Sequence, residues 1–579
     1  MAVFEKKKIL KVTLDDTVNL SCVIETAEKK TDHIAYTLHV QRGPKPENSW
    51  TLTKRYSDFA SLDSQLKISN IEIPLPPKKV FGNFSREFVA ERQQGLQTYL
   101  NAVLAEPLLA RSVFVKQFLD TNNYADNIPV LALQHVSMVF RSEKRWEVVE
   151  TIPDLGTRLR KTYVLVKPVD QPKQRQLLSW VDFGPDKNIP DKELTAILKL
   201  FPSIQHPYIL PYPFAGCSES GGMVIQDYIE RGTMRDMLCK CKPRSHYLKK
   251  YCKPKNVMPV DLSVVKILGR MILESLQFLH DKGLPYGHLH AGNLLFNGKK
   301  CQLLELHNSL LGLPSYYRPF FIQFKKIKTT EIVDVYCFGH LLFEMYFGEQ
   351  LKQPTCDRFP PDCPPQLRSV LESILTTEAC KNGLPTVQDL LSHTLFSDVT
   401  LPATDKPILK IPSKLKEAIR QAKEEMEGRL QEEQKVFHKI KRISKAKEFH
   451  MSEEEKKKRR KSKKKASENG VPDQATASSS DSTVSSSSSS TKTAPASVPA
   501  PPPPPPSNPP SAGAPAPPPP PPPPAAGAPA PPPPPPTAPS GKTQPSATGQ
   551  RGALLSSING FNKGGLKKCV TVDKSGPKL

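Results

Sequence analysis

Three blocks of consecutive prolines, at 501–506, 517–524 and 531–536, limit what the C-terminal part of this 579-residue chain can fold into. Proline fixes φ and has no backbone N–H to donate, so neither a helix nor a central strand continues through such a block. A serine-rich run at 478–490 precedes the blocks. This composition cannot bury enough apolar surface to offset the entropy lost on ordering. We therefore predict a disordered Ser/Pro-rich linker over 467–545, with the folded parts elsewhere.

Charge and apolar content limit the partners and the location. Lys and Arg number 81 against 57 Asp and Glu, a net charge of +24, which favours anionic partners such as phosphoinositide headgroups, actin or nucleic acid. We find no uncharged apolar run long enough to cross a bilayer and no signal-peptide core at the N-terminus. Eleven cysteines without a C-x-x-C pair fit reduced thiols. We expect a cytoplasmic location and no metal site.

Residues 10–125 have the pattern of a small α+β domain. Apolar and polar residues alternate over 9–14, 18–24 and 34–40, which predicts three strands. Helical spacing follows over 58–66 and 88–104, and the prolines at 74, 76 and 77 force an extended turn between these helices.

Basic residues from three of these elements could converge on a phosphate. Arg55 ends a strand, Lys79 follows the proline turn and Arg92 lies on the second helix. A phosphomonoester needs cations from several directions, and Arg offers a planar fork for two hydrogen bonds. Tyr56 would offer a flat face to an inositol ring. The alternative is that the three cations are separate solvated charges.

The order of these motifs, RYSDF at 55–59, LPPKKV at 75–80 and ERQQGLQTYL at 91–100, resembles the phox-homology (PX) domain. The resemblance implies that Arg55, Tyr56, Lys79 and Arg92 bind phosphatidylinositol 3-phosphate, with Lys78 as an accessory cation. Two further residues near the turn, Phe81 and Phe84, are either a wedge that dips into the membrane or part of the core.

The sequence pattern of residues 130–398 predicts a larger, two-lobed α+β domain. Strand patterns at 163–167 and 223–229 come first, and helical patterns at 262–280 and 332–347 follow. The segments HLHAGNLLF at 288–296 and DVYCFGHLLFEMYFG at 334–348 resemble the catalytic loop and a large-lobe helix of protein kinases. The resemblance implies a protein-kinase-like fold.

The catalytic positions of that family are altered here. The resemblance places Lys167 as the strand lysine and Asn293 as a metal-binding asparagine, but it places His288 at the catalytic base and Glu305 at the metal-binding aspartate. Only Gly156 stands where three spaced glycines would cover the phosphates. We expect a pseudokinase without catalytic or metal-binding residues, with no required cofactor and at most weak ATP binding through Lys167 and Asn293. The alternative is a weakly active, unconventional serine/threonine kinase at endosomal or plasma membranes.

Residues 410–466 are highly charged. A helical pattern over 413–449 leads into the basic run KKKRRKSKKK at 456–465. This run fits an anionic membrane leaflet, a nuclear localisation signal or a nucleic-acid contact, or it is a solvated tail. No aromatic residue interrupts it for base stacking, and we expect no nucleic-acid partner.

The segment 548–571 regains apolar character. Leu554, Leu555 and Ile558 share one face of a short helix, and Leu566, Lys567 and Lys568 follow two glycines. The segment resembles the WASP-homology-two motif, which implies binding of monomeric actin through these six residues; a frayed apolar tail is the alternative. The polyproline blocks just upstream suit proline-recognising proteins such as profilin.

Together these parts predict a multi-domain scaffold: an α+β PX domain, a two-lobed kinase-like domain, and a largely disordered basic, Ser- and Pro-rich tail. The hypothesis is a phosphoinositide-binding, actin-linked adaptor that regulates the trafficking or activity of membrane-protein cargo at endosomal or plasma membranes. An active kinase and a nuclear basic protein are the competing hypotheses.

Overall fold

A three-stranded antiparallel sheet begins the fold, in the computed structural model that describes residues 14–78, 84–125, 127–153, 155–298 and 300–468. Its order is β1-β2-β3. The strands are β1 (Leu20–Lys29), β2 (Ile34–Arg42) and β3 (Ser49–Arg55). The predictions over 18–24 and 34–40 are thus confirmed, whereas the third strand is 49–55. The segment 9–13 lies outside the described residues, and Leu14 is not in a strand.

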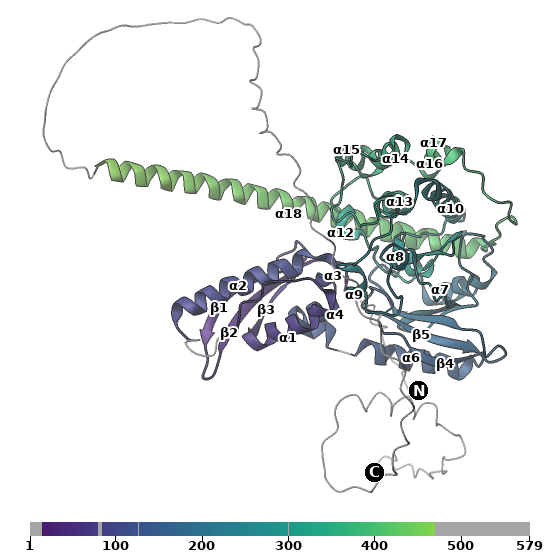
Figure 1. Cartoon of the computed structure of the whole chain (residues 1–579), viewed down its shortest axis with the longest axis horizontal. Coiled ribbons are helices and arrows are strands. Elements are labelled where there is room, and N and C mark those ends of the chain that lie inside the picture. The colour runs from purple at the N-terminus through teal and green to yellow at the C-terminus, as the bar shows by residue number, and fades with distance from the viewer. Residues whose placement is uncertain (1–13, 79–83, 126, 154, 299, 469–579) are drawn as a thin grey trace, which may run out of the picture. The chain divides into compact units, whose positions relative to one another are not determined.

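Helices cover one face of this sheet (Figure 1). They are α1 (Tyr56–Leu66), η1 (Lys67–Ser69), α2 (Arg86–Ala105), α3 (Pro107–Ala110), α4 (Val113–Leu119) and α5 (Thr121–Tyr124). The two long ones confirm the helical predictions over 58–66 and 88–104. The apolar side chains of α2 that face the sheet, Leu96, Tyr99, Leu100 and Val103, are almost fully buried. They pack with Leu38 and Val40 of β2, which makes the first hydrophobic core.

A five-stranded antiparallel sheet forms the smaller lobe of the second domain, in the order β4-β5-β6-β8-β7. The strands are β4 (Trp146–Thr151), β5 (Lys161–Pro168), β6 (Gln176–Asp182), β7 (Phe214–Cys217) and β8 (Gly221–Asp227). Its helical elements are α6 (Ile128–Ser142), α7 (Asp191–Leu198) and η2 (Phe201–Ser203). Val136 of α6 packs against Val164 and Trp180 of the sheet, and Leu194 of α7 joins the main core of the larger lobe.

The larger lobe is mostly helical. Its elements are α8 (Met234–Leu238), α9 (Tyr247–Tyr251), α10 (Leu262–Asp281), η3 (Ala291–Asn293), β9 (Leu294–Phe296), β10 (Cys301–Leu303), α11 (His307–Leu310), α12 (Arg318–Phe321), α13 (Thr330–Phe347), α14 (Pro365–Leu375), α15 (Thr377–Asn382), α16 (Val387–Ser392) and α17 (Thr394–Ser397). The sequence of α13 is apolar nearly all round, and every residue from 333 to 345 is buried, so this helix is the centre of the lobe. The predicted helices over 262–280 and 332–347 are confirmed as α10 and α13.

Asp334 of α13 fixes the loop that precedes η3. Its buried carboxylate accepts a hydrogen bond of 2.8 Å from the backbone N–H of Gly287 and lies 3.0 Å from Nε2 of His280. A buried carboxylate is stable only when its oxygens are paired in this way. The loop at 286–293 therefore has one position relative to the core.

The two domains share hydrophobic packing. Leu248 of α9, which belongs to the larger lobe by sequence, is fully buried in the core of the N-terminal domain beside Leu66 and Val115. The described residues accordingly form one unit. A last helix, α18 (Ser413–Glu468), contains the helix predicted over 413–449 and continues through the basic run. None of the described helices has both the length and the apolar content needed to cross a membrane.

A buried ion pair between α8 and α13 gives a test of this packing. The guanidinium of Arg235 donates two hydrogen bonds, of 2.9 and 3.0 Å, to the carboxylate of Glu344, and both side chains are at most 3% exposed. We predict that Arg235→Met lowers the free energy of unfolding by about 3–5 kcal/mol, because an unpaired buried carboxylate remains. The double variant Arg235→Met with Glu344→Leu should lose less, and chemical denaturation of the three proteins measures both effects.

The exposed pair of Arg244 and Glu150 is the control, since its partners are each 48% exposed. Arg244→Ala should cost less than about 1 kcal/mol. Equal losses for Arg235→Met and Arg244→Ala would contradict the assignment of the α8–α13 pair.

Candidate functional site

Three of the four residues predicted to bind a phosphoinositide lie at the junction of β3, α1 and α2. Arg55 caps the N-terminus of α1, and its backbone N–H donates to the carboxylate of Asp58 at 2.9 Å. Its side chain is 56% exposed, and Nε lies 3.8 Å from the carboxylate of Asp58. The next residue, Tyr56, is half-buried and donates from Oη to the carbonyl oxygen of Pro76 at 2.6 Å. This bond ties α1 to the proline turn.

Arg92 is held between aromatic rings. Its guanidinium carbon lies 4.5 Å from the ring centroid of Tyr56 and 4.1 Å from that of Phe88, and Nη2 donates to the carbonyl oxygen of Pro77 at 3.2 Å. The side chain is only 8% exposed, yet no described carboxylate pairs with it. Its buried Nε has no hydrogen-bond partner among the described atoms. A buried cation without an anion is costly, so this position suits an anionic ligand.

Four other residues near the proline turn were singled out in the sequence, and the structure describes two of them. Lys79 and Phe81 lie outside the described residues, and Lys78 is exposed. Phe84 is 45% exposed, with Nζ of Lys29 4.8 Å from its ring centroid. The core alternative for Phe84 is therefore wrong, whereas the wedge alternative stays a prediction.

A cleft of about 950 Å³ lies between the two lobes of the second domain. Residues of β5, the loop before it, and the 290–308 segment line this cleft. It would have to hold any nucleotide. A Cβ on Gly156 would lie 2.8 Å from the ring of Tyr163, so the glycine lets the loop between β4 and β5 pack directly on this ring.

An internal ion pair spans the cleft. Lys161 of β5 is fully buried, and its Nζ is paired with the carboxylate of Glu305. The same ammonium lies 3.2 Å from Nε2 of His307 and 3.3 Å from Oδ1 of Asn308. Burial lowers the pKa of Lys161, and the carboxylate of Glu305 opposes that shift. Glu305 has φ of 65°, a left-handed conformation that is unusual for a non-glycine residue.

This pair corrects the prediction for Lys167. That lysine lies farther along β5, is 32% exposed, and pairs with Glu147 of β4 at 3.0 Å. It does not line the cleft, whereas Asn293 does. Because side chains alternate along a strand, an even separation of six residues puts Lys161 and Lys167 on the same face but far apart along it. Lys167, the predicted strand lysine, therefore does not lie with Asn293 in the cleft.

His288, which the sequence analysis predicted at the position of the catalytic base, is buried, and one of its ring nitrogens has a hydrogen-bond partner. Nη2 of Arg158 lies 2.9 Å from Nδ1 of His288. Arginine can only donate, so Nδ1 accepts and the proton of the neutral ring is on Nε2. Burial and the nearby charge of Arg158 lower the pKa of His288 well below its usual value. Neither nitrogen is free to accept a proton from a substrate hydroxyl.

Helix α18 covers the other side of His288. A second cavity, of about 410 Å³, is lined both by His288 and Gly287 and by Met426 and Leu430 of this helix. The carboxylate of Glu427 accepts hydrogen bonds from the backbone N–H of Thr330 at 2.8 Å and from its hydroxyl at 3.1 Å. The helix is thus fixed on the side of His288 that faces this cavity.

A buried ion cluster fixes α18 in this position. The guanidinium of Arg318 lies 3.1 Å from Asp186 and 2.8 Å from Glu433 of α18. Arg429, also of α18, lies 2.5 Å from Asp186. Asp15, from the segment before β1, lies 3.7 Å from Arg318. The cluster therefore joins four parts of the chain.

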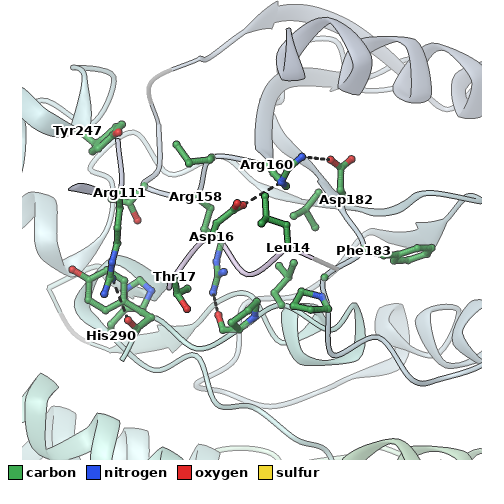
Figure 2. Close-up of a pocket in the computed structure, with 18 of the residues that line it drawn as sticks. Leu14, Asp16, Thr17, Arg111, Arg158, Arg160, Asp182, Phe183, Tyr247 and His290 are labelled. Carbon is green, nitrogen blue, oxygen red and sulfur yellow. Dashed lines mark hydrogen bonds and ion pairs between the residues drawn. The ribbon is translucent and has the colours of Figure 1, made fainter. Parts of the chain in front are cut away.

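The segment before β1 also enters a pocket of about 820 Å³ between the domains, shown in Figure 2. Asp16 lies 3.2 Å from Arg160 and accepts a hydrogen bond of 2.5 Å from Oη of Tyr124. On another side of the pocket, Nη1 of Arg111 donates to the carbonyl oxygen of Tyr316 at 3.2 Å. These contacts join the N-terminal domain to the second domain.

Sequence reasoning missed Lys161, Arg158 and the covering role of α18. The sequence signal for Lys161 was the position of Gly156. The strand that directly follows this glycine loop is the second strand of the sheet, and the first lysine of that strand lies beside the cleft. The sequence indicates the packing of α18 on the larger lobe only weakly, because this helix has few apolar residues. Among the described residues, no group of three or more His, Cys, Asp or Glu side chains is arranged to hold a metal ion.

The predicted actin-binding residues, Leu554, Leu555, Ile558, Leu566, Lys567 and Lys568, lie outside the described residues, as do the polyproline blocks. The backbone of the basic run at 456–465 is helical within α18. Family models nevertheless match both ends of the chain: a PX domain over residues 43–122 and a WH2 motif over residues 547–576. Both resemblances inferred from the motifs are thereby confirmed.

Relatives extend this likeness across the middle of the chain. The Slowpoke-binding protein of Drosophila melanogaster is 31% identical over 277 residues, which cover 44% of this chain and 53% of that one. The probable inactive serine/threonine-protein kinase slob2 of Dictyostelium discoideum is 31% identical over 241 residues, or 40% of this chain and 41% of its own.

The match to a mouse protein is longer. The PX domain-containing protein kinase-like protein of Mus musculus is 52% identical over 446 residues, which cover 77% of each chain. This identity and coverage show that the chain belongs to the family of PX domain-containing protein kinase-like proteins.

Proposed function

We propose that this chain is a membrane-associated, actin-linked adaptor whose kinase-like domain transfers no phosphate. The observation that carries the proposal is the buried pair of Lys161 and Glu305 in the cleft. In a kinase, the lysine binds nucleotide phosphates and the acidic residue binds the metal. Here the two groups are paired with each other, so a nucleotide and its metal would have to break this pair to reach either charge.

The rest of the cleft supports the same conclusion. Phosphoryl transfer needs a positioned base for the acceptor hydroxyl, but the imidazole of His288 accepts from Arg158 and lies beneath α18. Asn293 keeps its place in the cleft, where its Nδ2 donates to the carbonyl oxygen of His288 at 2.9 Å. We therefore propose that the chain needs no cofactor and binds ATP weakly at most.

The PX domain supplies the membrane contact in this proposal. The exposed Arg55 and the buried Arg92, whose guanidinium carbon lies 4.5 Å from the ring centroid of Tyr56, would contact the phosphorylated inositol headgroup, and Lys79 would complete the cations. The ligand we propose is phosphatidylinositol 3-phosphate. Burial lowers the solvent screening around Arg92, so a phosphate there gains more than at an exposed lysine.

The tail supplies the link to actin. The WH2 motif supports binding of monomeric actin by residues 554–568, and the polyproline blocks suit profilin. The protein partner of the kinase-like domain is proposed to be membrane-protein cargo. A relative that is named for binding Slowpoke supports a protein partner for this part of the family. Endosomal and plasma membranes are the proposed locations.

For the cleft, we predict that the full chain transfers no more phosphate from Mg-ATP or Mn-ATP than its Lys161→Ala variant does. Radiolabelled ATP with protein acceptors measures this, and a thermal shift assay measures nucleotide binding. Lys167→Ala is the control, since that side chain lies outside the cleft. Metal-dependent transfer that disappears in Lys161→Ala but persists in Lys167→Ala would overturn the proposal and favour the unconventional kinase.

For the membrane, we predict that Arg55→Ala combined with Arg92→Ala weakens binding to vesicles containing phosphatidylinositol 3-phosphate by at least about tenfold, since two charge-assisted contacts are lost. Vesicle sedimentation of the full chain measures this. Arg86→Ala, an exposed residue at the start of α2, is the matched control. Because Arg92 is also packed, Arg55→Ala alone and Arg92→Lys are measured beside it; unchanged binding in all three would remove the site.

For actin, we predict that Leu554→Asp with Leu555→Asp abolishes binding to monomeric actin, since two apolar side chains worth about 1.5–3 kcal/mol each can no longer be buried. Fluorescence anisotropy with labelled actin measures the affinity. Ser557→Asp introduces a charge nearby and should have a smaller effect. An affinity that is equal in the wild-type chain and the leucine variant would contradict the assignment.

A further inference from the structure

Helix α18 consists of a packed part and an unpacked part. In the packed part, Ile419 and Leu430 are at most 5% exposed, and Gln434 is 2% exposed. The side-chain amide of Gln434 donates to the carbonyl oxygens of Phe324 at 2.9 Å and Ile327 at 2.8 Å. No residue between 435 and 450 is buried. The helix is therefore fixed at one end and extends away from the larger lobe at the other (Figure 1).

The unpacked part, residues 435–450, is here called the basic arm. Every residue from 441 to 450 is exposed, so no described element covers any face of the helix there. Two of these residues are large and apolar: Ile443 is 45% exposed and Phe449 is 65% exposed. Packing within the described part of the chain thus explains neither the helix nor its apolar side chains.

The charge of the basic arm is strongly one-sided. Its cations are Lys435, Lys439, Lys441, Arg442, Lys445 and Lys447, and its single acid is Glu448. Lys435 pairs with Glu432, and none of the other five cations has a described carboxylate within ion-pair distance. The pairs 441/445, 439/442 and 442/445 place like charges three or four residues apart, which destabilises an isolated helix. A surface of negative charge would remove this repulsion.

We propose that the basic arm binds the surface of an anionic lipid bilayer. The cations would contact lipid phosphates and carboxylates, and Ile443 and Phe449 would enter the boundary between headgroups and acyl chains. The exposed apolar residues favour a bilayer over nucleic acid, because a nucleic-acid backbone gains nothing from them. The proposal deepens the proposed membrane role, but it uses residues that the PX site does not.

Because the basic arm is attached to the larger lobe, its contact with a bilayer would also affect membrane binding by the PX site. The PX site and the basic arm belong to one unit, so a bilayer bound by one raises the effective concentration of the other. Membranes that carry both a 3-phosphoinositide and general anionic lipid would bind the chain more tightly than membranes with either alone.

The test uses the full chain and phosphatidylcholine vesicles with or without phosphatidylserine, all free of phosphoinositide. The arm variant replaces Lys439, Lys441, Arg442 and Lys445 by Glu. The control variant replaces four exposed lysines of the larger lobe, Lys242, Lys249, Lys253 and Lys255, by Glu, so both proteins have the same net charge. Circular dichroism checks that both stay folded.

We expect the wild-type chain and the control variant to sediment with phosphatidylserine vesicles, and the arm variant to bind at least about tenfold more weakly. Ile443→Asp with Phe449→Asp should also weaken binding without changing the number of cations. Equal loss in the arm and control variants, or no loss in either, would overturn the proposal. The proposal would also be overturned if the wild-type chain did not bind these vesicles but changed the electrophoretic mobility of a labelled DNA duplex.

The same proteins separate this proposal from the PX assignment. Adding phosphatidylinositol 3-phosphate to neutral vesicles should increase binding of the arm variant as much as that of the wild-type chain. The increase should disappear in Arg55→Ala with Arg92→Ala. If the wild-type chain responds to phosphatidylinositol 3-phosphate but not to phosphatidylserine, the basic arm is not a membrane contact. If it responds to phosphatidylserine but not to phosphatidylinositol 3-phosphate, the PX assignment is wrong.

Discussion

The position of α18 and of both lobes depends on the buried guanidinium of Arg318. Its carboxylate partners come from the segment before β1, from the smaller lobe and from α18. Taking such a group out of water is expensive, and the expense is offset only when all the carboxylates are in place. Arg429 completes the cluster at Asp186. Four distant segments are therefore ordered together, and the covering of His288 by α18 follows from this.

The cleft shows the same principle on a smaller scale. A nucleotide-binding cleft is normally a place where charges await a ligand, but here Lys161 and Glu305 satisfy each other and Arg158 is bound to His288. The PX site differs, because Arg92 is nearly buried and has no described carboxylate partner. One domain has internal partners for its cations, and the other leaves a cation for a ligand. This contrast supports the proposal that a ligand binds at the PX domain.

The positions of Arg55, Tyr56 and Arg92 could be largely predicted from the sequence because these residues lie in short motifs on consecutive elements. Arg55, Tyr56 and Arg92 meet where β3, α1 and α2 join, and the order of the elements already implied this. The long helices α10 and α13 were equally clear, since apolar spacing alone identifies them. The actin-binding residues and Lys79 stay predictions.

The cleft was harder because it depends on which strand of a sheet a lysine occupies. The YVLVK pattern suggested Lys167, but β5 is the second strand of its sheet and the neighbouring β6 has no lysine in its sequence. The covering by α18 could not be predicted either. It depends on ion pairs between residues more than 100 apart in sequence, and no local pattern records such pairs.

The small helix α9 has a mechanical consequence. Leu248 is part of the PX-domain core although it follows the smaller lobe in sequence. A PX domain held at a membrane and a tail held by actin would place the chain under tension. Within the described unit, that tension would pass through a shared apolar core and a buried ion cluster, both of which resist shear. The unit would respond to load as a single stiff body.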